Sequence, residues 1–262
     1  MLKTRIITAV IALVILGVVL FVLPERLAEA FIAAVVVAGA WEWSAFLGAA
    51  AKATRVAFVV VIAVAIGLLY SVFSHYSVLV LQVAFVWWFC AFLWILFFPT
   101  PIPGPLRWAA GVLVLVPLFI ALVELYRIGP PTVLFALLIV WAADAGAFFA
   151  GTQFGRVKLA PSISPGKTWE GVFGGLLVVA LLALGVAYRT DISMAVLLPF
   201  CLAVAALSIV GDLTVSMFKR TAGVKDSGTL FPGHGGILDR VDSIASSAPL
   251  FALGIGWLGL SG

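Results

Sequence analysis

The sequence predicts an all-α, polytopic membrane protein with about nine transmembrane helices. Of its 262 residues, 65% are hydrophobic and 10% are charged, and the mean hydropathy is +1.28. A soluble chain of this length cannot bury so large an apolar excess, because globular proteins are about half apolar and a quarter charged. The apolar residues also form continuous runs, whereas the strands of a transmembrane β-barrel alternate apolar and polar residues. The composition therefore excludes soluble, disordered and disulfide-rich secreted proteins.

Nine runs are long and apolar enough to predict membrane-spanning helices, which need about 20 residues each. In chain order they cover residues 6–23, 28–47, 56–73, 78–98, 108–126, 132–154, 171–188, 194–218 and 244–260. Short segments rich in Pro, Gly or charge separate them, such as residues 99–105 and 129–131. The first run is longer than the apolar core of a signal peptide, so we interpret it as an uncleaved first helix.

The distribution of basic residues predicts a cytoplasmic N-terminus. With nine spans, 12 of the 15 Lys and Arg residues fall on the N-terminal side of the membrane, and only Arg26, Arg127 and Arg189 fall on the other side. Cytoplasmic segments carry the excess of Lys and Arg, so this asymmetry supports both the orientation and the span count. We divide the chain into an N-terminal region of five spans, residues 1–130, and a C-terminal catalytic region, residues 131–262. The two long cytoplasmic loops, 155–170 and 219–243, belong to the second region, so we expect the chemistry on the cytoplasmic face.

Rare carboxylates mark candidate functional positions in the C-terminal region. Asp144 lies inside the sixth predicted span, where a carboxylate costs about 2.5–3.5 kcal/mol and indicates a functional site. The alternative is a structural carboxylate paired with a buried cation. Asp212 shares one helical stripe with Ser216 and Lys219, which suggests a polar cavity or a protein interior. The carboxylates of the outer loops are expected to be solvated, and they are Glu25, Glu29 and Asp191.

The 219–243 loop combines cations, carboxylates and glycines in the way expected for a site that binds a divalent metal and phosphates. It contains Lys219-Arg220, Lys225-Asp226, Phe231-Pro-Gly-His-Gly-Gly236 and Asp239-Arg-Val-Asp242. Mg²⁺ takes carboxylate and phosphate oxygens, and glycines let backbone N–H groups approach an anion. Acids at the start of a ninth helix would also suit its dipole, which is the structural alternative for Asp239 and Asp242. His234 is either structural or a hydrogen-bond donor to a phosphate.

The 155–170 loop leads into Ser162-Ile-Ser-Pro-Gly-Lys-Thr-Trp-Glu-Gly171, which partly matches the phosphate-binding pattern G-x-x-x-x-G-K-[ST]. We reject a nucleotide-hydrolase fold, because Pro161 occupies the first glycine position and no strand is expected before it. Lys167, the neighbouring hydroxyls and a following helix N-terminus still favour an anion. A helix start with Thr168 as N-cap and Glu170 in the first turn is the structural interpretation, and both can hold.

Together these motifs resemble the phosphatidate cytidylyltransferase (CDP-diacylglycerol synthase) family. Residues 216–242 match the family signature S-x-φ-K-R-x4-K-D-x-G-x2-φ-P-x-H-G-G-φ-x-D-R-φ-D at every fixed position, where φ is apolar. The Gly211-Asp-Leu213 segment, the 162–171 stretch and Asp144 before Phe148-Phe149 also look like family features. The motif-bearing resemblance spans residues 141–242, and the first five spans resemble the family only in hydropathy.

The resemblance implies a nucleotidyltransferase of phospholipid biosynthesis that converts CTP and phosphatidic acid into CDP-diacylglycerol and pyrophosphate. It also implies Mg²⁺, a second cation such as K⁺, a homodimer, and a place in the bacterial cytoplasmic (inner) membrane, with no nucleic-acid partner. By matching position, the expected metal ligands are Asp212 and Asp239, with Asp242 and Asp144 as further members of the shell. The other candidate catalytic residues are Lys219, Arg220, Lys225, Asp226, His234 and Arg240. The candidate substrate- and phosphate-binding residues are Ser164, Lys167, Thr168, Ser216, Gly235 and Gly236.

We expect the headgroup of the lipid to reach a funnel between spans six, eight and nine, while its acyl chains stay in the bilayer. Two other functions remain open at this point. One is a CTP-dependent cytidylyltransferase for another lipid phosphate. The lipid tail is recognised only by apolar surface, so the sequence does not specify which lipid is used. The other is a secondary transporter that uses Asp144 and Asp212 as coupling-ion sites. The clustering of polar residues on one side of the membrane favours the enzyme over the transporter.

Overall fold

The computed structural model describes residues 2–48, 51–72, 74–228 and 235–258, and these form a helical bundle. This confirms the predicted all-α, polytopic class. In the described residues the α-helices are α1 (Leu2–Phe21), α2 (Glu25–Trp43), α3 (Lys52–Ser71), α4 (Ser77–Phe97), α5 (Gly104–Ile128), α6 (Pro130–Phe154), α7 (Trp169–Arg189), α8 (Met194–Thr221) and α9 (Leu238–Gly254). Three short 3₁₀ helices are η1 (Ser44–Leu47), η2 (Ser74–Tyr76) and η3 (Ile255–Leu258).

A small antiparallel hairpin between α6 and α7 departs from the prediction. Strands β1 (Lys158–Ala160) and β2 (Ser164–Thr168) pair with Lys158 opposite Thr168 and Ala160 opposite Ser164. The expectation that no strand precedes the Lys167 segment was therefore wrong. Its strands are three and five residues long, and the Pro, Gly and Lys of the second carry no strand periodicity, so the sequence offers little signal for them.

In the part of the chain that the structure describes, seven helical segments are long and apolar enough to cross a membrane, from Glu25–Leu47 to Met194–Thr221. The apolar part of α1, Ile7–Phe21, is shorter. Helix α9 has 17 residues, which corresponds to about 26 Å at 1.5 Å per residue and is less than a typical bilayer core of about 30 Å. The protein is thus an integral membrane protein by its helices, and nine crossings stay a prediction.

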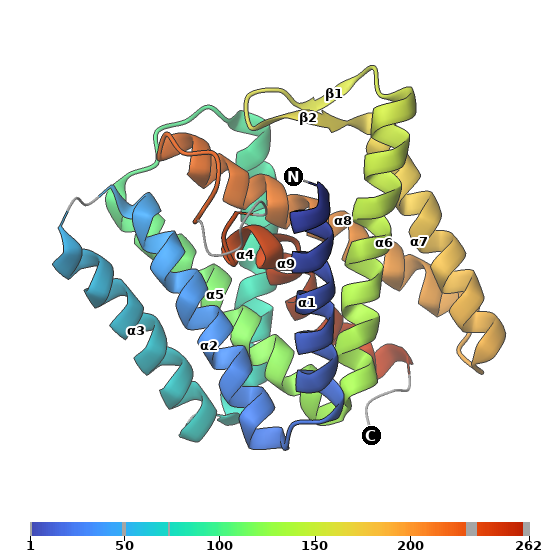
Figure 1. The fold of residues 1–262 in the computed structure, drawn as a ribbon, viewed down its shortest axis with the longest axis horizontal. Coiled ribbons are helices and arrows are strands. Elements are labelled where there is room, and N and C mark those ends of the chain that lie inside the picture. Colours follow the sequence, from blue (N-terminus) through green and yellow to red (C-terminus); the bar gives the residue numbers. More distant parts are fainter. Residues whose placement is uncertain (1, 49–50, 73, 229–234, 259–262) are drawn as a thin grey trace.

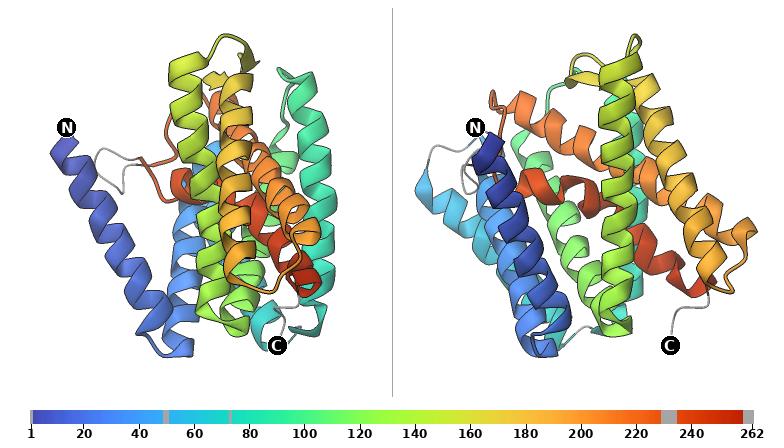
Figure 2. Two further views of the ribbon diagram at one scale, coloured as in Figure 1. Left: turned by 90° about the vertical axis from the view of Figure 1, so that its right-hand side faces the viewer. Right: turned by 45° about the vertical axis from the view of Figure 1, so that its right-hand side comes forward.

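The helices alternate in direction along the bundle, and the hairpin marks one end of it (Figure 1). The start of α1, the connection through η1, the hairpin and the end of α8 lie at this end, while the end of α9 lies at the other (Figure 2). In Figure 1, α2, α3 and α5 lie on one side, α6 and α7 form a pair on the other, and α1 stands between them. Helix α8 crosses obliquely behind them. This arrangement places the hairpin of the predicted 155–170 loop and the end of α8, where the 219–243 loop was predicted to begin, at the same end of the molecule.

Helices α6 and α7 approach each other closely because glycines line their contact. A Cβ atom added to Gly146 would lie 2.7 Å from the carbonyl oxygen of Gly174, and one added to Gly175 would lie 2.6 Å from that of Ala143. Small residues at such contacts allow transmembrane helices to pack backbone against backbone. Helix α7 therefore lies against α6 on both sides of Asp144, and this contact positions α7 and the hairpin that precedes it.

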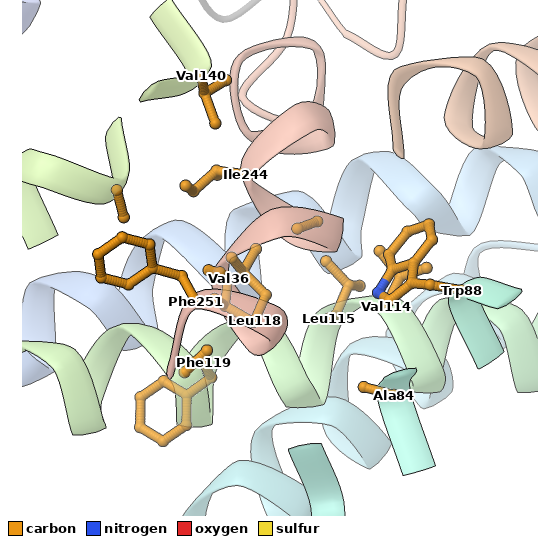
Figure 3. Close-up of a cluster of buried hydrophobic side chains, with 14 of the residues drawn as sticks. Val36, Ala84, Trp88, Val114, Leu115, Leu118, Phe119, Val140, Ile244 and Phe251 are labelled. Atoms are coloured by element: carbon orange, nitrogen blue, oxygen red, sulfur yellow. The ribbon is translucent and has the colours of Figure 1, made fainter. Parts of the chain in front are cut away.

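Helix α9 lies in the centre of the bundle, and packs against α2, α4, α5, α6 and α8. Every residue from Asp242 to Pro249 is buried, so this helix is enclosed on all sides. Two of its serines donate their hydroxyls to backbone carbonyls, Ser246 Oγ to Leu207 of α8 at 2.7 Å and Ser247 Oγ to Ser243 at 2.9 Å. Figure 3 shows the apolar cluster around α9, with Val36, Ala84, Trp88, Val114, Leu115, Leu118, Phe119, Val140, Ile244 and Phe251 labelled.

At the opposite end of the bundle, the prediction that Glu29 is solvated was wrong. The residue is 4% exposed. Its carboxylate accepts a hydrogen bond from Arg127 Nε at 2.8 Å and one from the Tyr70 hydroxyl at 2.6 Å. This network joins α2, α3 and α5, because a buried carboxylate requires a cation and hydrogen-bond donors around it.

Candidate active site

The end of α8 and the start of α9 meet through a buried ion pair. Lys219 Nζ lies 2.8 Å from Asp239 Oδ1, and the two side chains are 10% and 9% exposed. The predicted span ended at residue 218, but α8 continues to Thr221, so Lys219 belongs to the same helix as Asp212, in line with the predicted stripe; α9 already begins at Leu238. Hydropathy marks the apolar part of a helix, whereas the helix itself continues into polar residues.

The second oxygen of Asp239 organises the loop between α8 and α9. Asp239 Oδ2 accepts hydrogen bonds from the backbone N–H groups of Ser227 at 2.9 Å and Gly236 at 3.0 Å. Burial opposes ionisation here, but the bonds from Lys219, Gly236 and Ser227 outweigh it and lower the pKa of Asp239. Asp239 is therefore ionised at neutral pH. Gly235 adopts φ +80°, a left-handed conformation that favours glycine.

A second ion pair connects the hairpin to α8. Lys167 Nζ on β2 lies 2.5 Å from Asp212 Oδ2, and both side chains are 27% exposed. Ser216 Oγ donates to Asp212 Oδ1 at 3.2 Å, which confirms that these residues share one face of α8. Asp144 interacts electrostatically with both Lys167 and Asp212, and Asp242 with Asp212 and Lys219. The structure thus brings the candidate carboxylates of α6, α8 and α9 close enough for their charges to influence one another.

Backbone contacts hold the hairpin over the end of α8. Arg220 Nε donates to the Ile163 carbonyl at 3.1 Å. Thr168 is the N-cap of α7 and accepts from the Gly171 N–H at 3.2 Å, as predicted. The Glu170 carboxylate accepts from the Val157 N–H at 3.1 and 3.2 Å. In this arrangement Arg220 and Thr168 support the local fold, and Lys167 points its ammonium group at Asp212.

A cavity of about 270 Å³ opens beside Lys167, between α6, α7, α8 and β2. Its polar lining comes from Asp144, Thr152, Lys167 and Thr168, and the rest is apolar or glycine. The predicted funnel included the ninth span, but α7 takes that place in the lining. The glycine contact draws α7 against α6, while α9 is enclosed in the core. The cavity combines the Lys167 cation and the Asp144 carboxylate with mostly apolar walls, and Lys167 could pair with the phosphate of an amphipathic molecule.

The remaining predicted residues have varied environments. Lys225, Asp226 and Arg240 are exposed, and Ser164 is the partly buried first residue of β2. Asp242 is 8% exposed and accepts a hydrogen bond from the Ser243 N–H at 2.8 Å. His234 lies outside the described residues. Across the described residues, no group of three or more His, Cys, Asp or Glu side chains is arranged as a metal site.

Comparison with known proteins decides the family. A model of the cytidylyltransferase family matches residues 3–257, which is almost the whole chain. The chain belongs to this family. The match extends the signature-based resemblance, which covered residues 141–242, to the first five predicted spans.

Curated relatives of the family align over nearly the whole chain. A phosphatidate cytidylyltransferase of Pseudomonas aeruginosa is 42% identical, with 96% of each chain covered. One of Haemophilus influenzae is 36% identical over 96% of this chain and 98% of its own. A shorter match, 48% identical over 120 residues, is with the Staphylococcus aureus protein of the same name, and it covers 45% of this chain.

Sequence reasoning missed two residues that the structure brings to the site, Glu42 and Ser227. Ser227 Oγ donates to Glu42 Oε2 at 2.7 Å, although the two residues are 185 positions apart. Glu42 lies between Trp41 and Trp43, inside the predicted 28–47 span. The argument that drew attention to Asp144, a carboxylate within a predicted span, applies equally to Glu42 and could have found it.

Proposed function

We propose that this protein is a phosphatidate cytidylyltransferase, which transfers the cytidylyl group of CTP to phosphatidic acid and releases pyrophosphate. The observation that carries the proposal is the complete signature at residues 216–242, in a chain that aligns end to end with relatives of that name. Two ion pairs support the proposal, because Lys219–Asp239 links the end of α8 to the start of α9 and Lys167–Asp212 links the hairpin to α8.

The chemistry requires two polyanions to meet, and the site offers cations for this purpose. A phosphate oxygen of the lipid attacks the α-phosphorus of CTP, the new P–O bond forms, and the bond to the β-phosphate breaks to release pyrophosphate. The phosphomonoester is already largely ionised at pH 7, since its second pKa is about 6, so no strong general base is needed. Lys167, Lys219, Lys225 and Arg240 are the side chains that we assign to phosphate charges, as in other phosphoryl transfers.

The cavity beside Lys167 is the proposed entrance for the lipid headgroup. Next to it, Phe148, Phe149, Phe173 and Leu177 are all more than 60% exposed on α6 and α7. In a membrane protein such residues face acyl chains, so the diacyl part of the substrate can remain in the bilayer. The headgroup phosphate would then pair with Lys167, which lines the cavity and already faces the Asp212 carboxylate.

Mg²⁺ is the proposed metal, and a second cation such as K⁺ the proposed companion. The oxygen donors of Asp212, together with Asp144 and Asp242 in its electrostatic neighbourhood, fit the ligand preference of Mg²⁺. Asp239 is the other proposed ligand, although its two oxygens already accept three hydrogen bonds. A bound metal would neutralise charge on the phosphates and on the leaving pyrophosphate. Metal binding at Asp212 would compete with the Lys167 ammonium group.

We also propose that the polar end of the bundle faces the cytoplasm from the bacterial inner membrane, and that two copies form a homodimer. The 12-to-3 distribution of basic residues supports the orientation. CTP is a cytoplasmic nucleotide, which agrees with this side. The homodimer rests on the family resemblance, and the mass of the purified protein in detergent tests it.

Incubation of the purified protein with labelled CTP, Mg²⁺ and phosphatidic acid tests the proposal. We expect label in the lipid phase and an equal amount of released pyrophosphate. Product with a polyprenyl phosphate or an ether-lipid phosphate, and none with phosphatidic acid, would favour the alternative lipid substrate. Ion-coupled solute uptake into proteoliposomes without product formation would favour the transporter.

A further inference from the structure

The Glu42 carboxylate binds residues that lie before and after the 229–234 segment of the signature. Glu42 is the penultimate residue of α2 and is 7% exposed. Its Oε2 atom accepts hydrogen bonds from Ser227 Oγ at 2.7 Å and from the Leu238 N–H at 2.8 Å. Its Oε1 atom accepts from the Ile237 N–H at 3.0 Å. One side chain of the N-terminal half thus binds residues both before and after the 229–234 segment.

Two of these donors belong to the start of α9. The first N–H groups of a helix have no acceptor within it, and the α9 N-cap, Ile237, provides no side-chain cap. Glu42 supplies the missing acceptor from another helix, and its negative charge suits a helix N-terminus. The next residue along α9 after Leu238 is Asp239, so the same contacts fix the position of that carboxylate and of its Lys219 partner.

Glycines and Ser227 adapt the loop to this carboxylate. A Cβ atom at Gly228 or at Gly236 would collide with the Glu42 carboxylate oxygens, so only glycine lets the backbone come this close. Ser227 bonds through its hydroxyl to Glu42 and through its N–H to Asp239. Ser227 therefore donates hydrogen bonds to two carboxylates from different helices, Glu42 of α2 and Asp239 of α9.

We propose that Glu42 is a positioning residue of the active site, whose carboxylate sets the geometry of residues 227–228 and 236–239 for binding of the CTP phosphates. This inference rests on the proposed function. Glu42 does not touch the reacting atoms; it acts through Ser227, the start of α9 and Asp239. The signature alone does not contain this residue, because Glu42 lies 174 positions before Ser216 in the sequence.

The test is Glu42→Gln in the full-length protein. Glutamine replaces one acceptor oxygen with an NH₂ group, which faces O–H and N–H donors, so at least one of the three bonds is lost. We expect kcat/KM for CTP to fall by roughly 10–100-fold, as for other residues that orient site ligands. Backbone hydrogen exchange of residues 236–239 should accelerate, and Glu42→Asp should recover part of the activity.

Glu29→Gln is the matched control, since Glu29 is also a buried, hydrogen-bonded carboxylate of α2 but lies at its other end. After normalisation to folded protein, we expect Glu29→Gln to keep the wild-type kcat/KM and the wild-type exchange at 236–239. If Glu42→Gln fails to fold, Ser227→Ala removes only the hydroxyl bond and should show a smaller change in the same direction.

Unchanged kcat/KM and unchanged exchange in Glu42→Gln, or in Ser227→Ala, would overturn the inference. Equal losses in the Glu42 and Glu29 variants would also overturn it, because they would indicate a general folding effect. Failure of the wild type to convert phosphatidic acid would refute the proposed function instead. The exchange measurement would then still decide whether Glu42 orders the loop.

Discussion

The Lys219–Asp239 ion pair allows stability and activity to be separated in one experiment. The pair has a 2.8 Å N–O distance, and about a tenth of each side chain reaches solvent. Removing one member of a buried pair leaves the other charge without compensation, which costs about 3–5 kcal/mol. We expect about 3 kcal/mol for Lys219→Met, at the lower end of the range because each side chain retains some contact with water.

The double variant gives the decisive comparison. Asp239→Asn removes the negative charge but keeps an acceptor for the Ser227 and Gly236 N–H groups. We expect Lys219→Met together with Asp239→Asn to cost at least about 1 kcal/mol less than the sum of the single variants, because no unpaired charge remains. All three variants should be almost inactive, because both charges are assigned to the metal and phosphates.

The assay combines denaturant unfolding in mixed micelles with product formation from labelled CTP. Additive destabilisation in the double variant would show that the two charges do not stabilise each other. Recovery of activity together with stability would show that the pair serves the fold alone. Either result would refute the reasoning.

Two further predictions concern the same region. Asp212→Asn should leave a folded, inserted protein with little turnover. The control is Lys52→Ala, which changes an exposed residue at the start of α3 and should reduce turnover only slightly. Near-normal turnover of Asp212→Asn would contradict the metal assignment. Since the pKa of Asp239 is lowered, its contribution to the free energy of unfolding is complete above the ordinary value of about 3.9 and is lost as pH falls through the lower folded value. The wild type should therefore lose more stability below about pH 4 than Asp239→Asn does, which unfolding curves at several pH values will check.

Most of the fold class was predictable from the sequence, because hydropathy is a property of short windows. The helices from α2 to α8 follow the predicted runs, and the start of α7 follows its Thr168 cap. The ends of the polar helices were not predictable in this way. Helix α8 carries Lys219 in its last turn, and α9 begins six residues before the predicted span, because backbone hydrogen bonding continues where hydropathy has already fallen.

In the candidate site too, contacts along one helix were predictable from the sequence, whereas contacts between distant elements were not. Residues on one helix face, such as Asp212 and Ser216, were predicted to lie together and do so. The Lys167–Asp212 and Lys219–Asp239 pairs required the hairpin and α9 to be placed in space. All four residues were named as candidates from the sequence, but the sequence did not predict which of them pair with one another.

Composition and motif spacing along the chain were enough to predict a helical membrane protein whose scarce charges carry the signature of one family. Which of these charges meet depends on how the helices pack in space. Glu42 reaches Leu238 across 196 positions, and Glu29 reaches Arg127 across 98. Both buried carboxylates needed donors that local sequence could not supply, and the packing of α2 against α5 and α9 brought those donors to them.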